Sequence, residues 1–452
     1  MKQSLKNTFI HKRFFLFKDL RYWSLPTHLT VEVTNRCNLR CSHCFQSHFS
    51  FPRGDLKPEV WEKVKKVLNQ VKSVSLSSAG EPLLAKKFRE YFLYCSSLNL
   101  PVSFTTNAQL LENWLEFLVG RLTQLNVSLD ALSESAYRQR RGVSPKKAIR
   151  ALKRLKALKD LQKTNLPEIS LIVVLNQENV DELIPLIRFA AEIGAVNVWA
   201  YHQIFYSAEE FKAKSLFFTP EKADKTIKAA LKLAEELKVE FIHPGTFDGE
   251  VAPHSATSHY LTRKGEKFFC QWIFNTTTVS WNGFVQSCCF CDRLFTGSLL
   301  EEDFSEIWNG PAYRYLRLRF LQGNPPPECQ NCQFWQVLSL DEKAFLCPHK
   351  EKALYRREAL IFKENRLNLR EAERLYQKGL SLLVQEEYEA AYEIFMKIWK
   401  QENLYFEALN AAGVCLALMG QKEKACETLI GTLAIFPEEE LVHHNWRQLF
   451  SD

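Results

Sequence analysis

The chain has 452 residues, a formal net charge of +7 at pH 7, 46% hydrophobic residues and 25% charged residues. This length predicts about three domains, and the hydrophobic content excludes a chain too polar to form cores. The chain is too long for a small secreted domain held together by its 13 cysteines. The basic N-terminus has no secretory apolar region, and no stretch reaches about 18 uninterrupted apolar residues, so we expect a cytoplasmic protein without a transmembrane segment.

The charge is distributed unevenly along the chain. Residues 371–452 carry 7 Lys and Arg against 14 Asp and Glu, so this tail is acidic and the preceding part is strongly basic. A basic body can indicate nucleic acid binding. Its charges lie along helical patterns such as residues 146–163, where leucines at helical spacing mark one packed face. We interpret these charges as a solvated helix surface and predict no nucleic acid partner.

After a basic extension at residues 1–28, short β-branched runs alternate with longer helical patterns to about residue 240. Strand and helix alternating at this rhythm predict βαβ units and a parallel sheet, which makes the region α/β. Polar residues at the carboxyl ends of such strands form the usual active-site edge. The six predicted strands are residues 29–34, 73–78, 102–106, 125–130, 169–175 and 196–201.

The first strand leads into Cys37-x3-Cys41-x2-Cys44. Three thiolates at short spacing can bind three irons of a four-iron cluster and leave the fourth iron open. The run from Thr34 to Cys44 resembles the signature of radical S-adenosylmethionine (SAM) enzymes, with His43 at the position where the family has an aromatic residue. The alternative is a structural zinc knuckle, although the x3 spacing is unusual for zinc and no fourth ligand follows nearby.

The resemblance implies the fold and the chemistry of the first domain. It implies a partial (β/α)6 barrel over residues 29–240 and a [4Fe-4S] cluster whose open iron binds SAM. It also implies that the reduced cluster donates one electron to SAM, which is cleaved to methionine and a 5′-deoxyadenosyl radical that abstracts a hydrogen from the substrate. A low-potential electron donor such as ferredoxin or flavodoxin is then required.

Further motifs follow the second and third strands. The run Ser78-Ala-Gly-Glu-Pro-Leu83 resembles the Gly-Gly-Glu-Pro motif of the family, with Ala79 in place of the first glycine. By this resemblance Gly80 and Glu81 receive the ammonium group of SAM, and His43 also contacts the cofactor. The third strand ends in Thr105-Thr-Asn-Ala108, similar to the Thr-Asn-Gly of the family.

The fourth strand ends in Val127-Ser-Leu-Asp130. The resemblance implies that Ser128 or Asp130 contacts the SAM ribose, and the alternative is a plain strand end followed by a helix cap. One of three arginines is expected to meet the SAM carboxylate, and the sequence does not decide among Arg138, Arg140 and Arg141.

A second cysteine system falls in residues 241–348, which we expect to form a small α+β domain. Residues 279–285 predict a hairpin, because Asn-Gly between apolar runs favours a tight turn. The pattern resembles the SPASM/twitch extension of radical SAM maturases and implies one auxiliary [4Fe-4S] cluster held by Cys270, Cys288, Cys329 and Cys332. A zinc site with four thiolates fits the same ligand count. A second auxiliary cluster is not expected, since position 338 is Leu, and Cys289, Cys291 or Cys347 could replace a ligand.

Residues 349–370 are expected to form a helical linker, and residues 371–452 an all-α domain. Gly379 and Gly413 are 34 residues apart, and so are two alanines and two large apolar residues in the same register. This period resembles tetratricopeptide repeats, which hold peptides or partner proteins. The alternative is a pair of generic helical hairpins that dock on the body. Because so few repeats are present, we expect them to lean on the helix predicted at residues 351–368.

The sequence therefore predicts a radical SAM enzyme of the SPASM/twitch type that acts on a peptide or protein side chain by oxidation or cross-linking. One alternative is the oxidation or rearrangement of a small polar metabolite such as an amino sugar. Another, from a different class, is a non-catalytic iron–sulfur scaffold or electron-transfer protein. The intact Gly80-Glu81-Pro82 argues against that last alternative.

Overall fold

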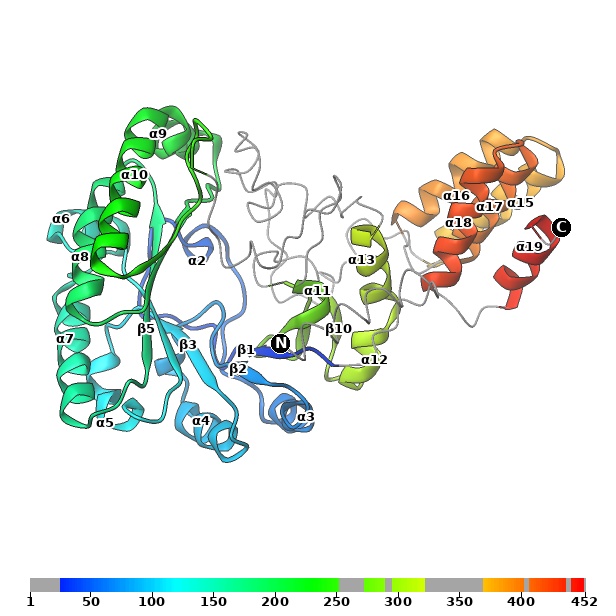
Figure 1. Cartoon of the computed structure of the whole chain (residues 1–452). Helices are drawn as coiled ribbons and strands as arrows, with labels where there is room; N and C mark the ends of the chain where they lie inside the picture. Colours follow the sequence, from blue (N-terminus) through cyan, green and yellow to red (C-terminus); the bar gives the residue numbers. More distant parts are fainter. Residues whose placement is uncertain are drawn as a thin grey trace.

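The computed structural model describes residues 25–251, 272–288, 295–321, 369–401, 406–435 and 440–450. One sheet runs through the first three of these segments, in the strand order β10-β9-β8-β1-β2-β3-β4-β5-β6-β7 (Figure 1). Its strands are β1 (His28–Val31), β2 (Ser73–Ser75), β3 (Val102–Thr106), β4 (Gln124–Ser128), β5 (Glu168–Leu175), β6 (Asn197–His202), β7 (Glu240–Ile242), β8 (Thr276–Val279), β9 (Phe284–Gln286) and β10 (Phe295–Ser298).

Strands β1 to β7 are parallel and follow one another in chain order. The six predicted strands are confirmed as β1 to β6, and β7 extends the sheet by one short strand. The helices of this region are α2 (Phe45–His48), α3 (Pro58–Leu68), α4 (Phe88–Ser97), α5 (Leu115–Leu118), α6 (Glu134–Arg141), α7 (Lys146–Leu161), α8 (Leu183–Glu192), α9 (Ala208–Lys214) and α10 (Pro220–Leu237).

Apolar periodicity explains why these segments pack as they do. In α7, Ala148, Leu152 and Leu155 share one face and are buried, while most of the charged residues point outward. The parallel strands bury nearly every second residue, as in β4, where Leu125 and Val127 are fully buried. Figure 1 shows the larger helices on the outer side of the curved sheet. They cover its outer face and leave the ends of the strands free for polar side chains. This arrangement is the predicted partial barrel.

The sheet continues without interruption into the predicted auxiliary domain. Strand β8 pairs in parallel with β1, with His28 opposite Thr276 and Val31 opposite Val279. Strands β8 and β9 form the predicted hairpin, whose turn places Gly283 at a φ of +97°, a conformation that favours glycine. The helices here are α11 (Trp272–Asn275), α12 (Phe304–Asn309) and α13 (Pro311–Leu321). The auxiliary domain is thus joined to the barrel edge rather than linked by a free hinge.

The tail forms consecutive antiparallel helices in its described parts: α15 (Leu369–Val384), α16 (Tyr388–Gln401), α17 (Phe406–Leu418), α18 (Lys422–Ile435) and α19 (Glu440–Phe450). A Cβ on Gly379 would lie 2.6 Å from the ring of Phe395, and one on Gly413 would lie 2.8 Å from the side chain of Leu429. The same contact therefore recurs after 34 residues. The resemblance to tetratricopeptide repeats stays a prediction, and residues 351–368 lie outside the described part.

The tail contacts the auxiliary domain. The rings of Tyr315 in α13 and Trp399 in α16 meet edge to face with their centroids 6.2 Å apart. Trp399 also packs with Leu409 of α17 in a small apolar cluster that includes Tyr315.

None of the helices in the described part of the chain has the length and apolarity that a membrane crossing needs.

Candidate functional site

The segment after β1 is held in place by hydrogen bonds to the loop at residues 52–55. The side chain of Asn35 accepts from the Gly54 backbone N–H at 2.7 Å and donates to the Pro52 carbonyl at 2.8 Å. Arg36 donates to both carboxylate oxygens of Asp55, at 2.6 and 2.7 Å. Such paired, charge-assisted bonds fix both position and orientation. The chain therefore enters the cysteine motif from a rigid base.

The three cysteines of the motif lie in one loop that ends in α2. Cys41 is buried, Cys37 and Cys44 are half-buried, and none of the three forms a disulfide. Cys44 caps α2, and its backbone N–H donates to the carbonyl of Cys41 at 3.1 Å. Burial raises the pKa of all three thiols, that of Cys44 to about 11. A bound metal deprotonates such thiols, so metal binding would offset the free energy needed to ionise them in a buried site.

Gly80 brings the loop after β2 against the cysteine motif. A Cβ at Gly80 would lie 2.5 Å from the carbonyl oxygen of Thr34 and 2.6 Å from that of Arg36, so only glycine fits. The Glu81 N–H donates to the Arg36 carbonyl at 2.8 Å. Gln46 in α2 donates to the carbonyls of Ala79 and Asn35. The cysteine motif and the Gly-Glu-Pro motif are therefore one structural unit.

The carboxylate of Glu81 is buried and connects this unit to the end of β3. It accepts hydrogen bonds from the Thr106 hydroxyl at 2.7 Å and from the Asn107 backbone N–H at 2.8 Å. Burial raises the pKa of Glu81 to about 7. Both donors belong to the Thr-Thr-Asn motif, a link between motifs that sequence reasoning missed. No local pattern reports it, because Glu81 and Thr106 lie in separate βα units.

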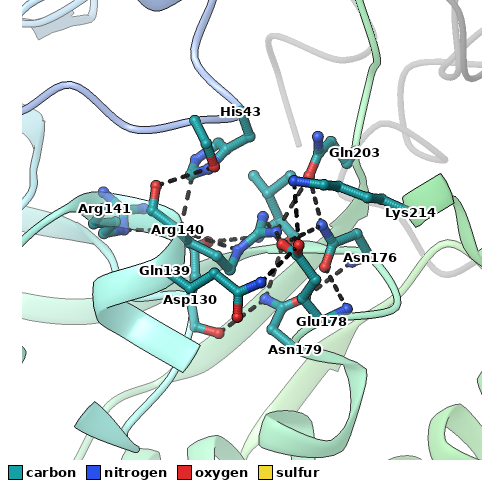
Figure 2. Close-up of polar contacts among 12 residues, drawn as sticks. His43, Asp130, Gln139, Arg140, Arg141, Asn176, Glu178, Asn179, Gln203 and Lys214 are labelled. Carbon is teal, nitrogen blue, oxygen red and sulfur yellow. Dashed lines mark hydrogen bonds and ion pairs between the residues drawn. The ribbon is translucent and has the colours of Figure 1, made fainter. Parts of the chain in front are cut away.

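Asp130, two residues after β4, is the centre of a second buried network (Figure 2). Its carboxylate accepts from Arg141 Nε at 2.7 Å, and its other oxygen accepts from the Val174 backbone N–H at 3.0 Å. His43 Nε2 lies 3.6 Å from the same carboxylate. Although burial alone would raise the pKa of Asp130, Arg141, His43 and Arg140 hold it well below its usual range. This network joins the cysteine loop to the end of β4.

The structure separates the three candidate arginines. Arg138 is exposed and pairs with Glu134 within α6. Arg140 is fully buried and donates to the Val174 carbonyl at 2.8 Å and to Gln203 at 3.2 Å. Figure 2 shows Arg140 and Arg141 directed toward Asp130. Arg140 and Arg141 thus lie inward beside Asp130, whereas Arg138 lies on the surface. Ser128 is the half-buried last residue of β4.

Gln203, Asn176 and Glu178 extend this network across the ends of β5 and β6. Gln203 accepts from Asn176 at 3.1 Å as well as from Arg140, and Glu178 forms an ion pair with Lys214 at 3.2 Å. Sequence reasoning missed these residues, since amide side chains at strand ends are ordinary in any βα loop. Together with Asp130 they form a connected set of polar side chains at the carboxyl edge of the sheet.

Comparison with known proteins identifies two domains. Residues 31–190 match the radical SAM superfamily, so this part of the chain is a radical SAM domain. Residues 270–333 match SPASM, an iron-sulfur cluster-binding domain, so this radical SAM enzyme also carries an auxiliary cluster domain.

This radical SAM enzyme is similar to several known proteins. The sporulation killing factor maturation protein SkfB of Bacillus subtilis is 26% identical over 329 residues, covering 70% of this chain and 71% of SkfB. A GTP 3′,8-cyclase of Clostridium botulinum is 27% identical over 240 residues, covering 48% of this chain and 73% of the cyclase. Streptococcus suis SuiB bound to SAM has a similar fold, with a TM-score of 0.52, 19% identity and coverage of 70% of this chain and 73% of SuiB.

The radical SAM domain uses a [4Fe-4S] cluster and SAM, and the SPASM domain uses auxiliary iron–sulfur chemistry. The cysteine loop fits the first cluster because donors surround its sulfurs: the Leu39 N–H and Asn107 Nδ2 contact Cys37 Sγ at 3.4 and 3.8 Å, and Arg141 Nη1 contacts Cys41 Sγ at 3.9 Å. Such donors favour the thiolate form. Cluster and SAM together supply a one-electron reductive cleavage of the sulfonium.

In the described residues, no group of three or more His, Cys, Asp or Glu side chains could hold a single metal ion. A four-iron cluster does not require this convergence, because each iron takes its own thiolate. Of the predicted auxiliary ligands, Cys288 is half-buried just after β9. Cys270, Cys329 and Cys332, and the alternatives Cys289, Cys291 and Cys347, lie outside the described residues.

Proposed function

We propose that this radical SAM enzyme modifies a peptide or protein side chain. The observation that carries the proposal is the extent of similarity to the maturation protein SkfB, which covers 70% of this chain. A match of that extent is longer than the barrel alone. SuiB, which has the same fold, has been solved with its precursor peptide SuiA. A small metabolite needs no helical tail, whereas a helical repeat is suited to hold an extended peptide.

The site residues have the following roles in this proposal. Cys37, Cys41 and Cys44 hold the cluster that binds SAM, and Cys270, Cys288, Cys329 and Cys332 hold the auxiliary cluster. His43, Gly80, Glu81 and Ser128 contact SAM. One arginine meets the carboxylate of SAM, and Arg140 and Arg141 are the candidates because both lie inward beside Asp130, whereas Arg138 is exposed. The hydrogen bonds of Asn35 and Arg36 to residues 52–55 position the cysteine loop that holds this cluster.

The test uses the enzyme reconstituted without oxygen and synthetic peptides that match any short open reading frames found beside its gene. With SAM and dithionite, we expect 5′-deoxyadenosine and a peptide that has lost two hydrogen atoms, both measured by mass spectrometry. Replacing Cys37, Cys41 and Cys44 together by Ala should abolish both products. Turnover of small molecules in place of every such peptide would contradict the proposal.

A second candidate is a small polar substrate. It is favoured by the similarity to GTP 3′,8-cyclases, which is as strong in identity as that to SkfB but covers 48% of this chain. The same reconstituted enzyme is therefore given GTP and amino sugars in parallel. Consumption of either one, dependent on SAM, would support this candidate over the peptide.

A further inference from the structure

Glu32, the residue directly after β1, joins two parts of the molecule that carry different cofactors. Its side chain is buried, with 1% exposed. One carboxylate oxygen accepts from the backbone N–H of Ala79 at 3.1 Å, and the other accepts from the backbone N–H of Trp281 at 3.2 Å. Ala79 belongs to the loop at residues 77–82, here called the SAM-motif loop. Trp281 is in the turn of the β8–β9 hairpin of the auxiliary domain.

The hairpin turn is also fixed from the other side. The Trp281 carbonyl accepts from the Lys57 N–H at 3.0 Å, and its ring lies so close to Gly54 that a Cβ there would be 2.3 Å away. Gly54 is the residue that binds Asn35 at the base of the cysteine loop. The turn therefore contacts the base of the cysteine loop through Gly54 and the SAM-motif loop through Glu32.

The physical consequence follows from burial. A buried carboxylate is stable when its hydrogen bonds are made, and losing one leaves a desolvated charge and an unpaired N–H. The backbone of Glu32 cannot move to compensate, because its N–H donates to the Val279 carbonyl at 2.8 Å next to the paired strands β1 and β8. The best position of the Ala79 N–H is thus tied to that of the Trp281 N–H.

We propose that Glu32 is a positioning residue that couples the SAM-motif loop to the auxiliary domain. SAM bound at residues 77–82 then stabilises the hairpin turn, and the hairpin in turn favours SAM binding, since coupling between two sites is reciprocal. The inference rests on the role of residues 77–82 in SAM binding and is independent of which substrate is modified.

The experiment measures amide hydrogen exchange by mass spectrometry in the cluster-loaded protein, with and without SAM. In the wild type, SAM should slow exchange both at residues 77–82 and at residues 280–286. Glu32→Gln keeps the size of the side chain but replaces one accepting oxygen by a donor. In this variant the slowing at residues 280–286 should disappear. The Kd for SAM should rise about tenfold, which is within the usual range for the coupling between two sites. Iron content should stay unchanged.

Two further variants make the result decisive. Lys63→Ala removes an ion pair with Asp303 that also joins the barrel to the auxiliary domain, but on the exposed rim, and it should leave both readouts at wild-type values. Glu81→Ala should weaken SAM binding directly, and unchanged affinity in this variant would overturn the assignment of the loop and the coupling with it. If SAM slows exchange at residues 280–286 in Glu32→Gln as much as in the wild type, the coupling is overturned, while the assignment of the SAM-motif loop stands. If Glu32→Gln does not fold, Glu32→Asp, whose side chain is one methylene shorter, replaces it. The same loss of slowing at residues 280–286 and the same rise in the Kd for SAM are expected, and wild-type values would overturn the coupling.

Discussion

Two buried carboxylates, one after β2 and one after β4, have opposite electrostatic surroundings. Asp130 is surrounded by Arg140, Arg141 and His43, and its pKa is held low. Glu81 accepts its hydrogen bonds chiefly from neutral groups, and burial raises its pKa to about 7. The difference follows from the partners, because opposite charges favour the ionised form of a buried carboxylate, whereas burial disfavours it. Glu81 is therefore the carboxylate of this pair whose charge changes near neutral pH.

We predict that the stability of the cluster-free protein reflects this titration. Because the folded-state pKa of Glu81 is above its ordinary value of 4.5, its contribution to stability is largest below pH 4.5 and is lost as the pH rises to about 7. Glu81→Gln does not titrate. The free energy of unfolding of the wild type minus that of the variant should thus decrease between these pH values, as measured by urea unfolding. A constant or growing difference would contradict the prediction.

A second prediction at this scale concerns the donors to the cluster sulfurs. Arg141 contributes a charged N–H to Cys41, whereas Asn107 contributes a neutral N–H to Cys37. Since hydrogen bonds and nearby positive charge raise the potential of a cluster, Arg141→Met should lower the reduction potential of the first cluster, and Asn107→Ala should lower it less. Redox titration followed by electron paramagnetic resonance measures both. An equal or larger shift for Asn107→Ala would contradict the predicted order, and an unchanged potential in Arg141→Met would show that the charge of Arg141 does not act on the cluster.

At the scale of elements, the tail helices depend on close approach. Gly379 in α15 and Gly413 in α17 each lie against a large side chain of the next helix, Phe395 and Leu429, both fully buried. Small residues at these points let the helices pack, and the repeated register makes the two hairpins equivalent. The auxiliary hairpin has the same dependence at Gly54, which Trp281 covers.

We predict that Gly413→Leu destabilises the tail by about 1–3 kcal/mol, because overpacking forces neighbouring side chains and backbone to shift. Thermal unfolding followed by limited proteolysis of residues 369–450 would report the change. The control is Leu418→Ala in the same helix, whose side chain is 49% exposed and whose loss should matter little. If both variants unfold together with the wild type, α17 and α18 do not pack as described.

At the scale of the whole molecule, the auxiliary domain stands between the barrel and the tail. Its strands extend the barrel sheet through β1 and β8, and its helix α13 meets the tail at Tyr315 and Trp399. This contact supports the alternative that the repeats dock on the body. It is also compatible with recruitment of a peptide, since docking places the acidic tail beside the auxiliary domain.

We predict that a chain ending near residue 350 keeps both clusters and substrate-free SAM cleavage but loses turnover of a peptide. The predicted ligands all precede this point, whereas the tail would recruit the substrate.

Trp399→Ala should weaken the docking of the tail on the auxiliary domain by about 3 kcal/mol and reduce peptide turnover. Leu441→Ala, at a residue 48% exposed on α19, should change neither. Added salt should weaken recruitment of a basic peptide, since exposed charges are screened over about 10 Å at 0.1 M. Loss of the auxiliary cluster on truncation would instead assign the tail a structural role.

The sequence by itself determined the strand and helix order of the barrel and placed Cys37, Cys41 and Cys44 in one loop, because these features depend on residues close together in the chain. It also placed the Asn-Gly turn of the hairpin. Tertiary structure decided which arginines face Asp130, since α6 alone does not say which side is buried. It likewise decided that β8 joins β1 and that Glu32 meets Trp281. Those contacts join segments some 250 residues apart, and no local period or propensity records which distant strand edge or backbone N–H a residue will meet.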